Sequence, residues 1–377
     1  MKFLIYIKNI IAWALFLLMR MMFPLIYKDG AGILFVSPTP IGDLVIASII
    51  FKNENLFSDK IYFLIDERYN GVYHDYEGKI EFISINTQLY KWSLFYRVKI
   101  VMQLRRLNIG CAININDNRT TLSDELTIFS GAIKRIALSY ESGRLIKIHK
   151  NIINKYYDKI LFTNTLNQFE KLYGLLKILR IQNPIRATCF YLTQKTIDKV
   201  KKLLGNNGIK NNDQFIAISP FASKSFRSWP IENYLKLIIQ ISESFNYKIL
   251  LLGDDQFAEE IDGLSKINLN SIINLSGKTS IVECAGIIKL SKLFIGNDSG
   301  LTHIAKALNV PLISIIGGGM YNRFFPYNAD EKYANYLVHK MDCFGCEWKC
   351  IYKEPICLTA VSVEQVFNII KNKNLIK

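Results

Sequence analysis

Residues 298–303 read DSGLTH and combine an acid, a hydroxyl, a glycine and one of the four histidines of the chain. They follow the apolar run LFIGN and precede the stretch IAKALNVP, so we expect them at the junction of a buried strand and a helix. Backbone N–H groups in the first turn of such a helix bind phosphate, and the side chains of Ser299 and His303 could add donors. Gly300 would allow close approach. Asp298 or Ser299 could instead serve only as the helix N-cap.

Short apolar strands alternate with helix-like segments along most of the chain. The predicted strands are 31–37, 61–66, 81–85, 111–115 and 133–138, followed by 215–220, 248–253, 272–277, 293–298 and 311–317. We expect helices over 44–53, most of 141–190 and 361–372. Continuous apolar strands separated by helices are typical of parallel sheets covered on both faces. The pattern predicts an α/β fold of two Rossmann-like, doubly wound domains facing a cleft, with ligands at the carboxyl edges of the sheets.

Four ordered motifs carry a resemblance to a known family. They are PTPIGD at 38–43, SPFASKSFRSWP at 219–230, LLGDD at 251–255 and NDSGLTHIAKALNVP at 297–311. Together they resemble glycosyltransferase family nine, the lipopolysaccharide heptosyltransferases, over about residues 31–370. The resemblance implies the GT-B fold. We expect a membrane-associating helix at 1–27, an acceptor domain at 28–190, a donor domain at 191–342, and a Cys-rich segment with a C-terminal helix at 343–377.

The loop 38–43 would be the acceptor loop in this family. The resemblance implies that Asp43 is the general base that accepts the proton of the acceptor hydroxyl. Thr39 and Gly42 accompany it, and we expect Gly42 to adopt an unusual backbone angle. Its position at the start of a helix is equally compatible with Asp43 as an N-cap.

The segments 219–230 and 298–303 would bind the diphosphate of a nucleotide-sugar donor. The residues expected to contact it are Ser223, Lys224, Arg227, Asp298, Ser299, Gly300 and His303. The alternative for 223–227 is a solvated loop without a role in binding. Arg227 replaces the usual Lys, which keeps the charge but changes its geometry.

No D-x-D motif is present to hold a divalent metal, and the adjacent Asp254 and Asp255 are typical of a turn. We therefore expect cations and helix N–H groups to stabilise the leaving diphosphate without a metal or other catalytic cofactor. The resemblance implies that an acid after 248–253 contacts the sugar of the nucleotide, and Asp254, Gln256 and Glu259 are the candidates in this chain.

Four cysteines form a C-x2-C-x3-C-x6-C cluster, namely Cys343, Cys346, Cys350 and Cys357. They could form a structural zinc site, although the spacing fits no standard zinc knuckle well. Reduced or partly oxidised structural thiols and an iron–sulfur site are the alternatives.

Residues 3–27 are apolar almost throughout but are interrupted by Lys8 and Arg20. The uninterrupted stretch is about half of the roughly 20 residues that a membrane span requires. We expect a helix lying in the membrane interface, with Trp13 and Phe16 in the acyl boundary. A single span and a helix packed on the protein's own core are the alternatives.

The formal net charge of +15 favours an anionic partner such as a membrane surface or a phosphorylated substrate. The basic residues are scattered and no RNA-binding signature is present, so nucleic acid is not an expected partner.

The resemblance implies an inverting glycosyltransferase that uses ADP-heptose and a lipid-linked or lipopolysaccharide core acceptor. It would work in the cytoplasm, attached peripherally to the inner face of the cytoplasmic membrane. A same-fold transferase using a UDP- or GDP-sugar and a non-catalytic, membrane-attached nucleotide-sugar binding protein are the competing hypotheses.

Overall fold

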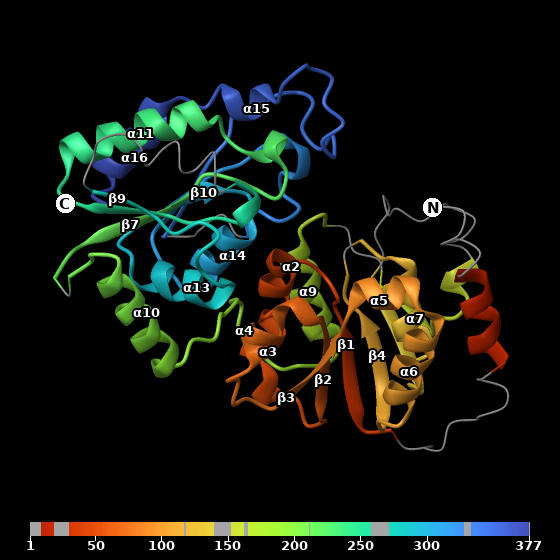
Figure 1. Ribbon diagram of the computed structural model, residues 1–377. Helices are drawn as coiled ribbons and strands as arrows, with labels where there is room; N and C mark the ends of the chain where they lie inside the picture. The colour runs from red at the N-terminus through yellow and green to blue at the C-terminus, as the bar shows by residue number, and fades with distance from the viewer. Residues whose placement is uncertain are drawn as a thin grey trace. The chain divides into compact units, whose positions relative to one another are not determined.

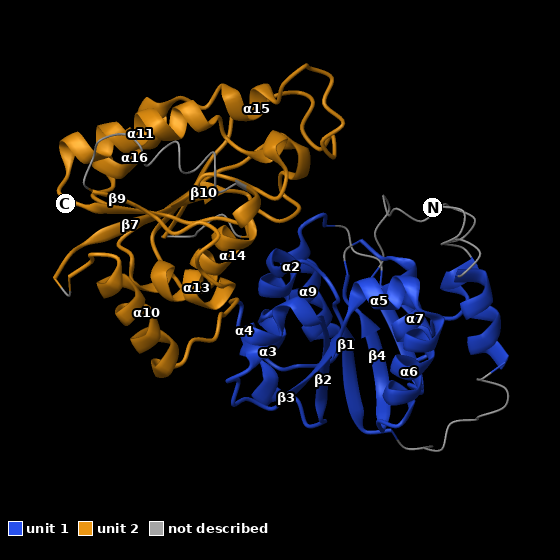
Figure 2. Cartoon of the chain, in the orientation of Figure 1, with its two compact units in different colours: residues 1–186 blue, residues 187–377 orange. Residues whose placement is uncertain are grey.

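The computed structural model describes residues 9–18, 30–116, 118–138, 152–161, 165–210, 212–257, 271–327 and 333–376. The chain divides into two compact units, unit 1 with residues 1–186 and unit 2 with residues 187–377 (Figures 1 and 2). Each unit contains a six-stranded parallel sheet flanked by helices, which confirms the predicted α/β fold.

The sheet of unit 1 has the order β3-β2-β1-β4-β5-β6. Its strands are β1 (Gly32–Val36), β2 (Ile61–Asp66), β3 (Ile80–Ile85), β4 (Ile109–Asn114), β5 (Lys134–Leu138) and β6 (Lys159–Leu161). Its helices include α2 (Ile41–Ala47), α3 (Ile49–Lys52), α4 (Asn70–Tyr73), α5 (Thr87–Trp92), α6 (Leu94–Arg105), α7 (Thr121–Ile128) and α9 (Gln168–Ile178). The strand order reverses at β1 and β4, so the loop after β1 lies at the point where doubly wound sheets bind ligands.

The sheet of unit 2 has the order β12-β11-β10-β7-β8-β9. Its strands are β7 (Phe215–Ser219), β8 (Lys248–Leu251), β9 (Ile272–Asn274), β10 (Phe294–Asn297), β11 (Leu312–Ile315) and β12 (Ala334–Leu337). Its helices include α10 (Gln194–Asn206), α11 (Ile231–Ser244), α13 (Ile281–Leu290), α14 (Gly300–Ala307), α15 (Ile356–Thr359) and α16 (Val363–Asn372). Here the order reverses at β7 and β10, whose following loops are the two predicted donor segments.

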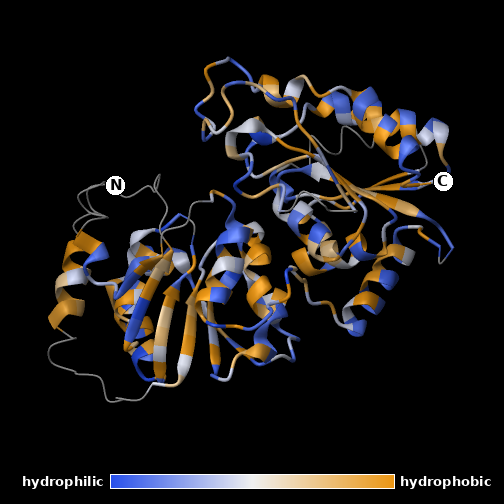
Figure 3. Cartoon of the chain, turned by 180° about the vertical axis from the view of Figure 1, so that it is seen from behind, coloured by the Kyte–Doolittle hydropathy of each residue, from blue (hydrophilic) through white to orange (hydrophobic). Residues whose placement is uncertain are grey.

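Many strand residues are apolar, coloured orange in Figure 3, as expected where helices cover both faces of a parallel sheet. In unit 1 the strand β2 is buried along its whole length. In unit 2 the helices α11 and α16 share a core with β7, β8, β10 and β11, centred on the buried side chains of Trp229 and Tyr234. This buried core holds in place the sheet edge from which the loops after β7 and β10 leave.

Every predicted strand is present, and the structure adds the edge strands β6 and β12, which were not predicted. The stretch 141–190 is not mainly helical where the structure describes it, since it holds β6 and then only α9. The predicted helix 44–53 is interrupted at Ser48, whose hydroxyl donates to the carbonyl of Val45 at 2.6 Å.

The N-terminal helix, which the structure describes over residues 9–18, packs against the rest of unit 1. Phe16 is 1% exposed, and the ring of Trp13 contacts Phe129 edge-on at 5.1 Å between centroids. The Nη2 of Arg97 donates to the Oδ1 of Asn9 at 2.9 Å. The prediction that Trp13 and Phe16 enter the acyl boundary is therefore wrong, because these side chains contact the protein's own core.

Among the helices that the structure describes, none combines the length and apolar character needed to cross a membrane. The outer side of the N-terminal helix nevertheless carries exposed apolar side chains, those of Ile10, Ile11 and Leu18. The rest of the predicted membrane segment, residues 1–8 and 19–27, lies outside the described residues.

Candidate functional site

The N-terminus of α14 lies at the carboxyl end of the central strand β10. Ser299 occupies the N-cap position, but within this fully described helix its hydroxyl makes no capping hydrogen bond. It lies 3.4 Å from the Oγ1 of Thr302, which in turn donates to the carbonyl of Asn297. Ser299 is therefore at the N-cap, as one interpretation of the sequence predicted, although its hydroxyl does not cap the helix. The first-turn N–H groups carry the positive end of the helix dipole and are suited to an anion.

The two predicted donor segments meet at an ion pair. Arg227 ends the short 3-10 helix η3 (Ser225–Arg227), and its Nη2 lies 3.3 Å from both the carbonyl and the Oδ2 of Asp298. The side chain of Arg227 is 23% exposed and that of Asp298 is 5% exposed. Burial raises the pKa of Asp298, and the charge of Arg227 opposes this shift. Ser223 and Lys224 are exposed on the same loop.

Asn297 connects the end of β10 to the loop after β7. Its role was not predicted from the sequence. Its Nδ2 donates to the carbonyl of Pro220 at 2.7 Å, and its Oδ1 accepts from the backbone N–H of Trp229 at 2.8 Å. The indole Nε1 of Trp229 donates to the carbonyl of Val361 at 2.8 Å. A fully buried amide at the end of an apolar strand is the sequence signal that could have identified Asn297, since buried polar groups require partners.

His303 lies one turn into α14 and is 4% exposed. Its Nδ1 lies 2.5 Å from the hydroxyl of Tyr327, its Nε2 lies 3.7 Å from Asp298, and its ring stacks on Phe325 at 4.1 Å between centroids. Burial, helped by the charge of Arg227, lowers the pKa of His303 to about 3. His303 is therefore neutral at pH 7 and can offer a hydrogen bond but no positive charge.

In unit 1, Asp43 is the third residue of α2, and the N-cap is Pro40. The prediction of Asp43 as an N-cap is therefore wrong, although the helix dipole still favours its carboxylate. Gly42 lies inside α2, so its expected unusual backbone angle is also wrong. The hydroxyl of Thr39 lies 2.9 Å from that of Ser37. Burial and, to a smaller extent, the charge of Asp43 raise the pKa of the neighbouring Tyr69.

The adjacent Asp254 and Asp255 form a turn, as the sequence predicts. Asp255 begins the 3-10 helix η4 (Asp255–Phe257), and the backbone N–H of Gln256 donates to the Oδ1 of Asp254 at 3.3 Å. The hydrogen bond between the two carboxyl groups raises the pKa of Asp254. The third candidate for sugar contact, Glu259, lies outside the described residues.

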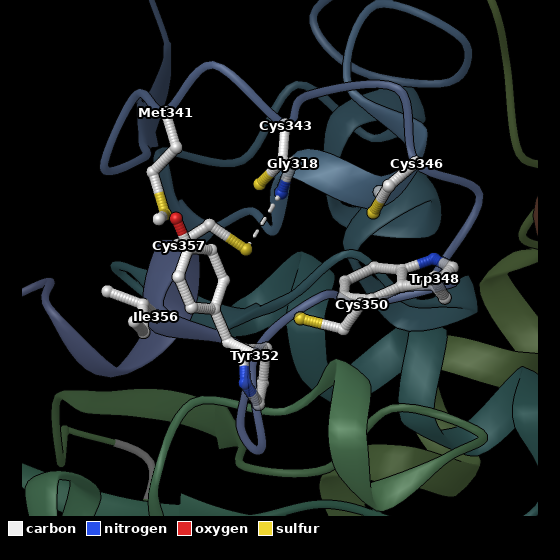
Figure 4. Close-up of a pocket in the computed structure, with 11 residues that line it drawn as sticks. Gly318, Met341, Cys343, Cys346, Trp348, Cys350, Tyr352, Ile356 and Cys357 are labelled. Atoms are coloured by element: carbon white, nitrogen blue, oxygen red, sulfur yellow. Dashed lines mark hydrogen bonds between the residues drawn. The ribbon is translucent and has the colours of Figure 1, made fainter.

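The four clustered cysteines line one pocket in unit 2 (Figure 4). All four are free thiols, and the backbone N–H of Gly318 donates to the Sγ of Cys357 at 3.3 Å. The described part of the chain, which includes Cys343, Cys346, Cys350 and Cys357, contains no group of three or more ligands placed to hold a metal ion. The structure therefore does not support the predicted zinc site. Burial raises the pKa of Cys357 and favours its protonated form.

Comparison with known proteins identifies the family. The family model of glycosyltransferase family 9 (heptosyltransferase) matches residues 103–350. Lipooligosaccharide heptosyltransferase 2 of Campylobacter jejuni is 25% identical over 248 residues, which cover 63% of this chain and 74% of that protein. Lipopolysaccharide heptosyltransferase 1 of Campylobacter coli is 23% identical over 344 residues, which cover 88% of this chain and 95% of that protein.

A solved structure has the same architecture. The ADP-heptose lipopolysaccharide heptosyltransferase II of Escherichia coli superposes with a TM-score of 0.69 and 16% identity, over 91% of this chain and 98% of that one. This likeness supports the GT-B fold class that the motifs predict. Because the family model covers most of the chain, including the donor loops, the protein belongs to glycosyltransferase family 9, the heptosyltransferases.

Proposed function

We propose that the protein transfers a heptose from ADP-heptose to a hydroxyl of a lipopolysaccharide core or related envelope glycan, with inversion at the anomeric carbon and without a metal. Family membership and the heptosyltransferases among its relatives support the sugar and the acceptor class. The observation that carries the proposal is the position of Arg227 beside the N-terminus of α14, at the edge of the unit 2 sheet.

The donor diphosphate would bind where these groups meet. The guanidinium of Arg227 keeps Nε buried and without a partner, and its Nη2 contacts to Asp298 are long at 3.3 Å, so it retains capacity for phosphate oxygens. The exposed Lys224 would add a second positive charge and Ser223 a hydroxyl. The N–H groups of Gly300 and its neighbours would bind a second phosphate oxygen. His303 would donate a hydrogen bond to the diphosphate from its neutral imidazole.

Asp43 of unit 1 would act as the base, and Thr39 and Gly42 would belong to the same acceptor loop. Its carboxylate accepts the proton of the acceptor hydroxyl while the hydroxyl oxygen bonds to the anomeric carbon. The bond between that carbon and the diphosphate oxygen breaks, and ADP leaves with the electron pair. A single displacement of this kind inverts the anomeric configuration. The cations and dipoles of unit 2 would stabilise the charge that develops on the leaving group.

Activity assays with defined components test this proposal. The protein is incubated with ADP-heptose and truncated lipopolysaccharides in the presence of a chelator, and products are identified by mass spectrometry and their anomeric configuration by NMR. We expect a heptose adduct of inverted configuration. Transfer from UDP- or GDP-hexoses but not from ADP-heptose would contradict the donor assignment. Binding of ADP-heptose without transfer to any acceptor would favour a non-catalytic binding protein.

The protein would work in the cytoplasm, at the inner face of the cytoplasmic membrane. Two features support peripheral attachment, the exposed apolar side chains of Ile10, Ile11 and Leu18 and the net charge of +15. The inner side of the N-terminal helix is occupied by unit 1, so only the outer side would contact lipid.

Co-sedimentation with vesicles containing anionic lipid tests the attachment. The triple variant Ile10→Asn, Ile11→Asn and Leu18→Asn keeps the packed residues Trp13 and Phe16. We expect this variant to remain in the supernatant while the unaltered protein sediments. Equal sedimentation of the two proteins would refute the role of this surface.

A further inference from the structure

The segment 341–357, here called the cysteine loop, contains all four clustered cysteines and packs on three consecutive glycines. A Cβ added to Gly317 would lie 2.2 Å from the ring of Trp348, and one added to Gly319 would lie 2.6 Å from it. Real Cβ atoms do not approach other atoms so closely. The glycines after β11 therefore form a floor that only glycine can provide, and the indole of Trp348 lies directly on it.

The backbone of the cysteine loop is bent to place this indole. Glu347 and Trp348 have φ angles of 50° and 63°. Residues other than Gly, Asn and Asp rarely adopt this left-handed backbone conformation. Such conformations persist where surrounding contacts hold them. The backbone N–H of Glu347 donates to the carbonyl of Gly319 at 3.0 Å, which fixes the bend to the glycine floor.

Trp348 also contacts the donor loop. The guanidinium carbon of Arg227 lies 5.6 Å from the indole centroid, within the range of a cation–π interaction. The ring of Phe226 lies 5.7 Å from the same indole. Trp348 thus contacts Phe226 and Arg227 of η3 and also the glycine floor.

Arg227 has few other restraints. Its Nη2 contacts to Asp298 are 3.3 Å long, and its Nε has no partner in the structure. Rotation of a long arginine side chain costs entropy when a ligand immobilises it. A flat aromatic ring under the guanidinium restricts that rotation before the ligand binds.

We propose that Trp348 is a positioning residue that orients Arg227 for the donor diphosphate, and that the cysteine loop serves to hold Trp348 in place. This inference rests on the proposed role of Arg227. It gives the cysteine cluster a function in donor binding, because Cys346 and Cys350 flank Trp348 and line the same pocket.

Kinetics of Trp348→Leu, Trp348→Phe and Arg227→Ala, and of the double variant Trp348→Leu/Arg227→Ala, test the inference. From the strength of cation–π contacts, we expect Trp348→Leu to raise the KM for the donor about three- to thirtyfold with a smaller change in kcat, and Trp348→Phe to recover part of the loss. In the Arg227→Ala background, Trp348→Leu should have little further effect, because the contact it removes is already absent.

Controls separate a local effect from misfolding. Tyr333→Leu alters an exposed aromatic side chain of unit 2 outside the cysteine loop and should leave the donor KM unchanged. Gly319→Ala should raise the donor KM by displacing the indole, and this effect should largely disappear when combined with Trp348→Leu. Thermal unfolding of each variant reports whether unit 2 remains folded.

The outcomes distinguish the inference from the proposed function. If Arg227→Ala leaves donor KM and kcat unchanged, the diphosphate role of Arg227 fails. If Arg227→Ala impairs the enzyme but the Trp348→Leu effect is absent or fully additive with it, the positioning role of Trp348 is overturned while the diphosphate role stands.

Discussion

The two units use buried charge in different ways. In unit 1, Arg97 pairs with Glu125 and Arg119 pairs with Asp124, and all four side chains are at most 5% exposed. In unit 2, Arg227 pairs with Asp298 at the sheet edge and is 23% exposed. The enclosed pairs of unit 1 join α7 to α6 and to the loop that precedes α7, and they are almost completely shielded from solvent. In the proposed function, the partly exposed pair of unit 2 exchanges one partner for a phosphate, so exposure at a sheet edge would distinguish the proposed functional pair from the structural ones.

Replacement of the proposed base should have the largest effect on activity. We expect Asp43→Asn to lower kcat about 10²- to 10⁴-fold, the usual contribution of a general base, with little change in donor binding. Steady-state transfer assays together with calorimetric titration of ADP would measure both quantities. The matched control is Asp59→Asn, an exposed carboxylate of the same unit. Unchanged transfer by Asp43→Asn would remove Asp43 from the mechanism.

The enclosed pair of unit 1 should affect stability rather than chemistry. Arg97→Met leaves the carboxyl of Glu125 buried without its cation and removes the hydrogen bond to Asn9. Loss of one partner of a buried ion pair costs roughly 3–5 kcal/mol of unfolding free energy. Denaturant unfolding would measure this loss. Transfer activity per folded molecule should stay close to that of the unaltered protein, and a selective fall in kcat would contradict the structural role.

We expect the partly exposed pair of Arg227 and Asp298 in unit 2 to affect activity more than stability. We expect Arg227→Ala to reduce kcat/KM for the donor about 10- to 100-fold, the scale of a lost charged contact to a leaving group. Its loss of unfolding free energy should be smaller than that of Arg97→Met, because the guanidinium of Arg227 is 23% exposed and its contacts to Asp298 are 3.3 Å long. Arg227→Lys keeps the charge and should recover part of the activity. Equal kinetics of Arg227→Ala and the unaltered enzyme would show that the exposed pair is structural as well.

The sequence predicted the strands and the donor loops because both follow local rules. Apolar runs specify buried strands, and DSG at a strand end is typical of a helix N-terminus, which is where α14 begins. Arg227 lies beside Asp298 because the strands β7 and β10 are neighbours in the sheet, an order that was not predicted from the sequence.

Features that depend on distant residues were not predictable. The neutral state of His303 depends on Phe325 and Tyr327, which follow it by more than twenty positions, and no periodicity links them to α14. The packing of Trp13 required Phe129 of another element. For the cysteines, spacing predicted that they would be close together, but only the structure showed that they surround Trp348 and the glycine floor.

The two units should also respond to pH in opposite directions. Burial raises the pKa of Glu125 to about 7 from 4.5, so its favourable contribution to unit 1 is complete below pH 4.5 and is lost as pH rises through 7. Burial lowers the pKa of His303 to about 3 from 6.5, so its contribution to unit 2 is complete above pH 6.5 and is lost as pH falls toward 3. Each group changes the unfolding free energy by at most about 1.4 kcal/mol per pH unit.

Hydrogen exchange of β4 and β10, followed between pH 5 and pH 8, would report the two units separately. After correction for the intrinsic exchange rate, protection of β4 should fall as pH rises, and protection of β10 should fall as pH decreases. Glu125→Gln should flatten only the first trend and His303→Gln only the second, because each amide keeps the approximate shape of the side chain without its titration. Parallel pH responses of β4 and β10 would mean that the two buried groups do not set the stability of their own units.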